Sequence, residues 1–126
     1  MICGTGIDIV EISRFERFVT EDNQLLLCRL FTPVEMAYCQ ERRRSAQHFA
    51  LRFAAKEAFL KALGTGLREG LSWQHIEVRN DHNGKPEFML SGTARDIFEQ
   101  RGLNHAHLSL SHDGNYAVAS VILEMR

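Results

Sequence analysis

Hydrophobic and polar positions follow two different periods along this chain. Between residues 11 and 63, apolar residues recur every three or four positions, which is typical of helices that bury one face. Before and after this region, short segments alternate or are continuously apolar between turn residues, as strands do. The pattern predicts strands over residues 2–10, 73–79, 86–90, 105–111 and 116–123, helices over 11–19, 45–63 and 93–101, and a further apolar segment over 24–31.

Capping and turn signals support this division. Thr32, Pro33 and Glu35 are typical of a helix start, with Thr32 as the N-cap, proline at the first position and a glutamate three residues after the cap. Asn83-Gly84 is typical of a hairpin turn. The order of elements predicts one α+β domain over residues 1–126, with an antiparallel sheet packed with one long helix and shorter helices.

Composition narrows the function classes. The net charge of −1 and the hydrophobic content of 44% indicate a soluble globular domain without a general attraction to nucleic acid or to an acidic membrane. No apolar run approaches the roughly 20 residues of a membrane span, and the first residues lack a signal-peptide pattern. Cys3, Cys28 and Cys39 are odd in number and lack metal-ligand spacing. We interpret them as reduced thiols that pack as small apolar residues in a cytoplasmic protein.

The long predicted helix carries an unusual pair of charges. At about 100° per residue, Glu57 and Lys61 lie side by side on the helical wheel, and their neighbours on that arc are apolar, namely Ala50, Phe53, Ala54 and Leu60. A carboxylate and an ammonium in an apolar stripe are costly unless they meet a partner, a metal or an anion. The pair is either an ordinary helix-stabilising Glu–Lys pair or part of a site.

Asp8 is a second unusual charge, because aspartate is rare in strands and Asp8 lies between apolar residues of the first strand. It either caps the following helix or pairs with Glu57 as a hard oxygen ligand. Two carboxylates with phosphate oxygens suit Mg²⁺, and Lys61 would meet the same phosphates. Gly4 and Gly6 indicate that another segment or a ligand approaches this strand closely.

Three further features are ambiguous by themselves. Gly64-Thr65-Gly66 is either a helix C-cap with a turn or a loop that lets phosphates approach the backbone. The three arginines at residues 42–44 either face solvent or bind an anion. His112 is either a surface loop residue or a phosphate donor.

Together, these segments resemble the 4′-phosphopantetheinyl transferases. Gly6-Ile7-Asp8-Ile9-Val10-Glu11 is similar to the first signature of that family, and residues 52–66, which include Lys56-Glu57 and Lys61, are similar to the second. Asn83-Gly84-Lys85-Pro86 and the segment 108–117 resemble the remaining landmarks. The short length and the spacing resemble the members that act in bacterial fatty acid synthesis.

The resemblance implies transfer of the phosphopantetheine arm of coenzyme A to a serine of an apo acyl carrier protein, with release of adenosine 3′,5′-bisphosphate. It implies that Asp8 and Glu57 bind Mg²⁺ and that Lys61 holds the phosphates, so these three would be the catalytic residues. The remaining coenzyme A contacts that it implies are Arg52, Gly64, Thr65, Gly66, Lys85, Pro86 and His112, with Arg43 and Arg44 at the 3′-phosphate. Arg14 matches a position that meets the carrier protein, and we place Arg17 and Phe18 beside it from their helical face.

The resemblance also implies a homotrimer that binds coenzyme A between subunits. An apolar long helix with more apolar surface than a small sheet covers is compatible with this. Glu57, Asp8 and Glu35 are all candidates for the general base. The alternatives to a transferase are a non-catalytic module that docks an acidic carrier-protein helix and a metal-dependent phosphohydrolase, but the module gives no reason for Asp8 and Glu57.

Overall fold

The computed structural model describes residues 1–68 and 70–126. Its elements are β1 (Ile2–Glu11), α1 (Ile12–Thr20), α2 (Gln24–Leu30), α3 (Pro33–Gln40), α4 (Ser45–Leu63), the 3₁₀ helix η1 (Trp73–His75), β2 (Ile76–Asn80), β3 (Pro86–Leu90), α5 (Gly92–Gln100), β4 (His105–Asp113) and β5 (Tyr116–Glu124). The predicted α+β class and the predicted bounds of the long helix are confirmed.

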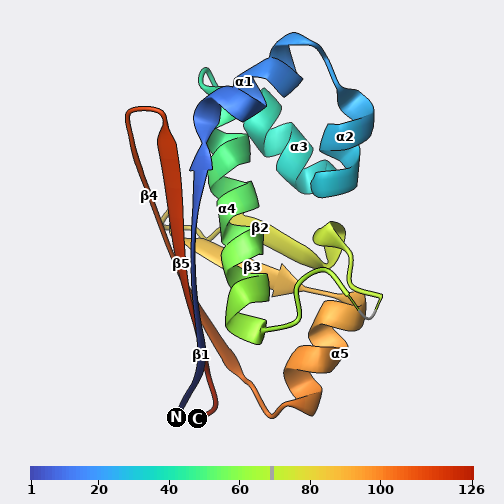
Figure 1. Cartoon of the computed structure of the whole chain (residues 1–126), viewed down its shortest axis with the longest axis vertical. Helices are drawn as coiled ribbons and strands as arrows, with labels where there is room; N and C mark the ends of the chain where they lie inside the picture. Colours follow the sequence, from blue (N-terminus) through green and yellow to red (C-terminus); the bar gives the residue numbers. More distant parts are fainter. Residues whose placement is uncertain (69) are drawn as a thin grey trace.

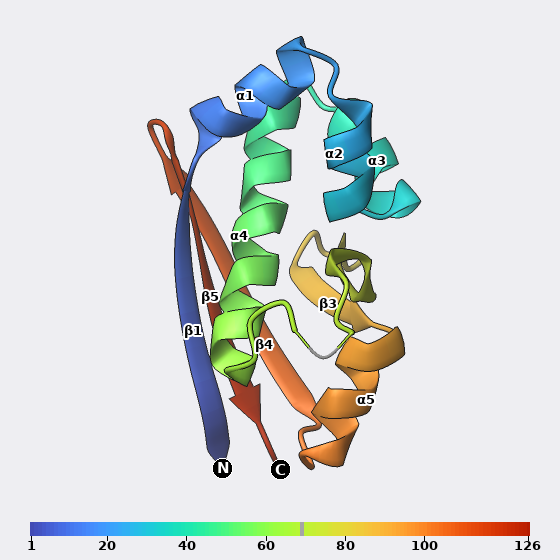
Figure 2. The same cartoon turned by 45° about the vertical axis from the view of Figure 1, so that its right-hand side comes forward.

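Helix α4 lies along one face of a three-stranded antiparallel sheet with the strand order β1-β5-β4 (Figures 1 and 2). Two glycines of β1 allow the helix to come this close. A Cβ atom on Gly6 would lie 2.0 Å from the carbonyl oxygen of Ala58, and one on Gly4 would lie 2.1 Å from that of Ala62. The close approach predicted at these glycines is therefore made by α4 and not by a ligand.

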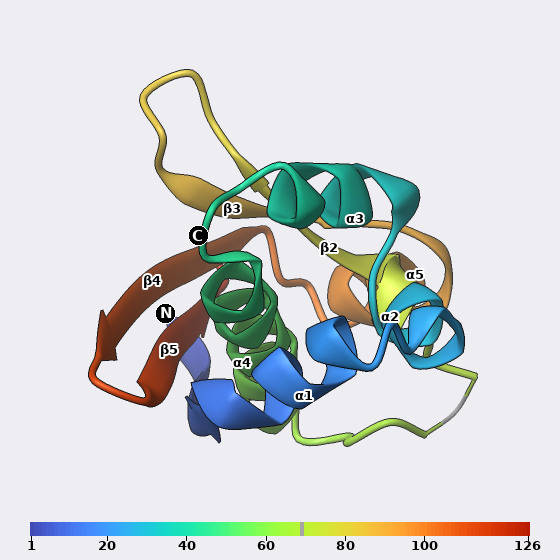
Figure 3. The ribbon, with the colours of Figure 1, turned by 90° about the horizontal axis from the view of Figure 1, so that it is seen from above.

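Helices α1, α2 and α3 gather at the end of the molecule where α4 begins, and β2 and β3 form a separate hairpin beside β4 (Figures 1 and 3). The capping box at the start of α3 is confirmed, because the Thr32 side chain accepts from the Glu35 amide and the Glu35 carboxylate accepts from the Thr32 amide. Phe15 of α1 packs against Phe31 and Phe53, which joins α1 to α2 and α4.

Two predicted strand boundaries differ from the structure by more than one residue. The segment predicted as a strand from residue 73 begins as the 3₁₀ helix η1, because the Ser72 side chain caps it by accepting from the Gln74 amide. The strand predicted to end at Ser111 continues to Asp113, since His112 still pairs with β5. His112 is therefore a strand residue near the β4–β5 turn.

The cysteines also differ from their interpretation as small packing residues. All three are free thiols, but only Cys39 is buried, whereas Cys3 and Cys28 are exposed. Within the described ranges, no helix is long and apolar enough to cross a membrane.

The sheet, and not the long helix, has a largely exposed apolar face. Phe49, Phe59 and Leu63 of α4 are all buried within this one chain, so our inference that the helix has surplus apolar surface is wrong. On the face of the sheet opposite α4, Ile7 is 65% exposed and Ile9 is 62% exposed. In the neighbouring strand, Val118 pairs with Ile9 and continues the apolar face.

Candidate active site

Strand β1 and helix α4 bring Asp8, Glu57 and Lys61 together at one edge of the three-stranded sheet. Asp8 lies on the face of β1 that packs against α4, and the Lys61 Nζ donates to its Oδ1 at 2.8 Å. The same ammonium donates to the carbonyl oxygen of Ile7 at 3.1 Å. The Asp8 side chain is only 14% exposed, whereas that of Lys61 is 54% exposed. The lysine is therefore anchored on the strand and still accessible from solvent.

Glu57 is half-buried, and burial is the main cause that raises its pKa. The negative charge of Asp8 raises the pKa further, while the positive charges of Lys61 and Arg14 oppose the change. The charged form of Glu57 is thus disfavoured by its surroundings, even though that form is the one that binds a metal.

These two carboxylates fit a hard divalent cation such as Mg²⁺. A cation between Asp8 and Glu57 would compensate the repulsion that raises the pKa of Glu57. In the part of the chain that the structure describes, no group of three or more His, Cys, Asp or Glu could hold a metal ion. The remaining ligands would therefore be water and phosphate oxygens, which Mg²⁺ prefers over an all-protein cage.

The alternative interpretations of these residues are wrong. Glu11 is the N-cap residue of α1 and its side chain makes no capping bond, so Asp8 does not cap that helix. Lys61 pairs with Asp8 across two elements and not with Glu57 along the helix. The unusual pair on the helical wheel thus belongs to a site that includes the first strand.

The loop Gly64-Thr65-Gly66 ends α4 beside this site. Gly64 has a φ of 80° and its amide donates to the carbonyl oxygen of Leu60, so the C-cap interpretation is confirmed. Thr65 is buried, and its hydroxyl donates to the carbonyl oxygen of Gly66 at 2.8 Å. A Cβ atom on Gly64 would meet nothing within 4 Å, so this backbone is open to a ligand as well.

A second group of predicted residues lies beside the opposite edge of the sheet, on the side of β4. Arg52, Lys85 and Pro86 line a cavity of about 330 Å³ that Tyr38 of α3 and Leu108 of β4 also line. Burial is the main cause that lowers the pKa of His48, a further lining residue, and His112 is among the charges that lower it further, which places His112 in the same neighbourhood. Since β5 separates β1 from β4, this chain does not by itself bring the two groups together.

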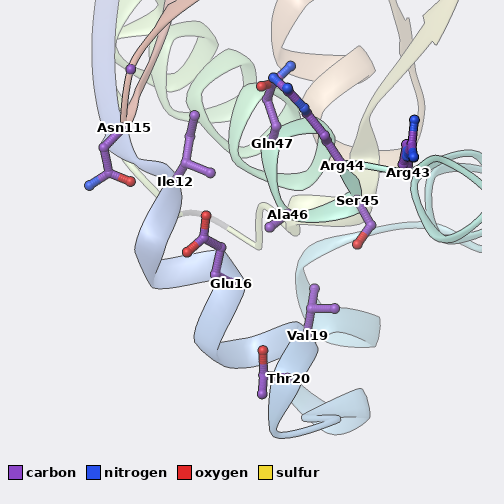
Figure 4. A pocket seen from close by; sticks show the side chains of 11 residues that line it. Ile12, Glu16, Val19, Thr20, Arg43, Arg44, Ser45, Ala46, Gln47 and Asn115 are labelled. Carbon is purple, nitrogen blue, oxygen red and sulfur yellow. The ribbon is translucent and has the colours of Figure 1, made fainter.

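Arg43 and Arg44 line a second cavity, of about 420 Å³, between α1, the start of α4 and the β4–β5 turn. Figure 4 shows Arg44 beside Gln47, while Glu16 and Thr20 of α1 lie across the cavity from the start of α4. The basic run therefore divides, because Arg42 turns toward Tyr38 instead.

Helix α1 presents the residues predicted to meet the carrier protein. Arg14 and Arg17 are exposed, and Phe18 is half-buried with its ring against Phe15 at 5.2 Å. The charge of Arg14 also reaches Glu57, where it opposes the rise in pKa. The basic face of α1 is thus adjacent to the Asp8–Glu57–Lys61 group.

The buried pair Lys56–Glu35 was not predicted. The Lys56 Nζ lies 2.6 Å from the Glu35 Oε1, and both side chains are fully buried. The other Glu35 oxygen accepts from the Val78 amide at 2.8 Å. Glu35 is therefore not a general base, because both of its oxygens are engaged in the core. The sequence pattern of the long helix could have revealed this pair. A helix that is apolar on all sides is buried, and a lysine in its middle is then buried as well.

Comparisons with known proteins identify the family of this chain. Residues 4–121 match the family model of the 4'-phosphopantetheinyl transferase superfamily. The chain belongs to this superfamily. It is 65% identical over 124 residues to the holo-[acyl-carrier-protein] synthase of Geotalea daltonii, covering 98% of this chain and 99% of that one.

Solved structures of the same kind of enzyme share the fold. The holo-[acyl-carrier-protein] synthase of Neisseria meningitidis is 36% identical, with a TM-score of 0.90 and coverage of 98% of this chain and 99% of that one. The Helicobacter pylori synthase, solved in complex with coenzyme A, is 31% identical, with a TM-score of 0.82 and coverage of 95% and 99%. The likeness thus extends over nearly the whole chain in sequence and in structure.

Proposed function

We propose that this protein transfers the 4′-phosphopantetheine arm of coenzyme A to a serine hydroxyl of an apo acyl carrier protein. The second product is adenosine 3′,5′-bisphosphate, and the holo-carrier protein serves fatty acid synthesis in the cytoplasm. The observation that carries this proposal is the group Asp8, Glu57 and Lys61, in which two carboxylates and an accessible ammonium meet at one sheet edge. A relative that is 65% identical over nearly the whole chain is a synthase of this kind.

In this proposal Asp8 and Glu57 hold Mg²⁺ and Lys61 binds the pyrophosphate of coenzyme A. The bound ion supplies neutralisation of the pyrophosphate charge during phosphoryl transfer. Lys61 binds phosphate oxygens with the N–H donor that is not engaged by Asp8 and Ile7. Asp8 and Glu57 are the carboxylates that remain as acceptors for the proton of the attacking serine, since Glu35 is engaged in the core.

The nucleotide end of coenzyme A would bind to the second group of residues. Arg52, Lys85, Pro86 and His112 lie on the β4 side, away from Asp8 on β1, which favours a site completed by a neighbouring subunit. Arg43 and Arg44 offer further positive charge to the 3′-phosphate from the cavity beside α1.

The proposed assembly is a homotrimer joined through the outer face of the sheet. Ile7 and Ile9 are largely exposed there, and an apolar face of this kind is typical of an interface. Such an interface would place the β1 edge of one subunit near a β4 edge of another. Light scattering in solution measures the mass of the assembly, and a monomer would contradict this part of the proposal.

The carrier protein would dock on α1, where Arg14, Arg17 and Phe18 offer two cations around an aromatic edge. An acidic helix complements this surface. The charge of Arg14 also acts on Glu57, so α1 lies near the proposed metal site. A serine presented on α1 would therefore be close to the phosphates.

Mass spectrometry of an apo acyl carrier protein, incubated with this protein, coenzyme A and Mg²⁺, tests the function. We expect the carrier mass to increase by one phosphopantetheine group, and the increase to disappear when Mg²⁺ is chelated. A carrier that binds but keeps its mass would support the non-catalytic module instead.

A further inference from the structure

Arg52 is a buried arginine whose donors are incompletely used. It is 3% exposed, and its Nε is the only buried side-chain nitrogen or oxygen without a hydrogen-bond partner in residues 1–68 and 70–126. The residue lines the cavity of about 330 Å³ beside β4, together with His48 and Lys85. A buried, unpartnered donor at a cavity points to an acceptor that binds there.

The Tyr38 ring stacks between two guanidinium groups, with that of Arg52 on one face and that of Arg42 on the other. The Cζ atoms of Arg42 and Arg52 lie 3.4 and 3.9 Å from the centre of the Tyr38 ring. Two guanidinium groups this close to one ring centre would overlap on a single face, so they occupy opposite faces. The His48 ring packs on the Tyr38 ring edge-to-face, and Asn80 Nδ2 also donates to the Tyr38 hydroxyl at 2.7 Å.

The stack keeps the two positive charges without neutralising them. In the described part of the chain, neither Arg42 nor Arg52 forms a salt bridge with a carboxylate, unlike Lys56 and Lys61. Burial lowers the pKa of His48, and the charges of Arg52, Arg42 and His112 lower it further, so the cavity has a positive potential. A cation–π stack of this kind leaves guanidinium N–H donors available to an anion.

We propose that Tyr38 is a positioning residue, which stacks between Arg42 and Arg52 and holds Arg52 ready to bind a phosphate group of the nucleotide. This inference rests on the proposed function, since the nucleotide is the bisphosphate part of coenzyme A. Positioning before binding reduces the ordering cost of the arginine side chain, and this gain appears as affinity for the phosphate. The role belongs to the tyrosine ring and not to its hydroxyl.

Two substitutions at Tyr38 separate the ring from the hydroxyl. Titration calorimetry with adenosine 3′,5′-bisphosphate as the probe should give about tenfold weaker binding for Tyr38→Leu and less than twofold weaker binding for Tyr38→Phe. In steady state, Tyr38→Leu should raise the KM for coenzyme A, with kcat and the KM for the carrier protein nearly unchanged. Equal losses in both variants, or no loss in Tyr38→Leu, would overturn the proposal.

A matched pair of arginine substitutions repeats the test without altering the ring. Arg42→Gln should weaken bisphosphate binding severalfold, whereas Arg95→Gln removes an equal charge from the exposed surface of α5 and should leave it unchanged. In the wild type, bisphosphate binding should raise the pKa of His48, measured by NMR, because an anion offsets the nearby positive charges. Equal effects of the two arginine substitutions, or a His48 pKa that does not rise, would contradict the proposal.

The design separates this inference from the proposed function. If the wild type neither transfers phosphopantetheine nor binds the bisphosphate, the proposed function fails and the inference fails with it. If the wild type does both and Tyr38→Leu binds as tightly, only the positioning role of Tyr38 is excluded.

Discussion

Helix α4 carries two lysines that each bind a carboxylate from another element, and they differ in what surrounds them. Lys56 has no exposed side-chain surface, and its ammonium donates to Glu35 at 2.6 Å and to the carbonyl oxygens of Leu30 and Trp73 at 2.8 and 3.0 Å. These acceptors use all three donors of a lysine. Lys61 binds Asp8 and Ile7, remains half exposed and keeps a free donor.

An ion pair alone therefore does not indicate a site. At Lys56 the pair is saturated and joins α2, α3 and η1 to α4, so it serves the structure. At Lys61 the pair is unsaturated and lies beside Glu57, a second carboxylate whose pKa is raised by burial and by Asp8. Accessible surface and unused hydrogen-bonding capacity distinguish the site from the structural pair.

The largest effect is expected from breaking the buried pair. Lys56→Met should lower the free energy of unfolding by about 3–5 kcal/mol, because it leaves the Glu35 carboxylate buried without its counter-charge. Urea unfolding measures this loss. The double variant Lys56→Met/Glu35→Gln should recover part of it, and a double variant that is less stable than Lys56→Met would contradict this account of the pair.

The corresponding change at the open pair should affect activity and leave the fold intact. Lys61→Met should change the free energy of unfolding by about 1 kcal/mol, because the Lys61 side chain is 54% exposed and solvent screens its pair with Asp8. Transfer of phosphopantetheine should fall by at least about tenfold, because the positive charge that binds the pyrophosphate is lost. Urea unfolding and the carrier-protein mass assay measure the two quantities, and a large loss of stability with full activity would reverse our assignment of the two lysines.

Arg14 tests whether the open region contains two functions that can be separated. We expect Arg14→Ala to raise the KM for the carrier protein severalfold, with little change in the KM for coenzyme A, because the removed charge faces the docking surface. Arg95→Ala on α5 is a matched control with the same change of charge. An unchanged carrier KM in Arg14→Ala would remove Arg14 from the docking surface.

The smallest effect is expected at the thiol beside the buried pair. Burial raises the pKa of the Cys39 thiol to about 12, so it stays neutral in the folded protein. Its contribution to stability is complete below an unfolded pKa of 9.0 and is lost as the pH rises toward 12. At pH 8, iodoacetamide should label the exposed Cys3 and Cys28 and leave Cys39 unlabelled, as peptide mass spectrometry would measure. Labelling of Cys39 in the folded protein would contradict its burial.

The sequence predicted those features that depend on local order. The capping residues of α3 and the Gly64 C-cap follow from neighbouring residues, and both are confirmed. The Asp8–Lys61 bond joins segments far apart in the chain and was not predicted. The charges placed among apolar residues led us to pair Asp8 with Glu57 as metal ligands and to place Lys61 at the same phosphates. Such an anomaly signals a partner without identifying it.

Features that depend on three-dimensional packing were not predicted. In the sequence, Lys56 is one more charge on the long helix. Its burial depends on α2, α3 and η1, which supply its three acceptors in the folded chain. The stack of Arg52 on Tyr38 likewise depends on how α3 lies against α4, whereas Arg42 reaches the same ring from four residues further along the chain. The uncovered apolar surface is on the sheet because α4 is enclosed by its own chain.

The most direct test of the central assignment is the transfer activity of Glu57→Gln, with its thermal unfolding as the control. The substitution keeps the shape of the side chain and removes the charge that burial disfavours, so the fold should be as stable as the wild type. We predict that no phosphopantetheine appears on the carrier protein, because one of two carboxylate ligands for Mg²⁺ is lost. Full transfer by a folded Glu57→Gln protein would contradict the assignment of this site.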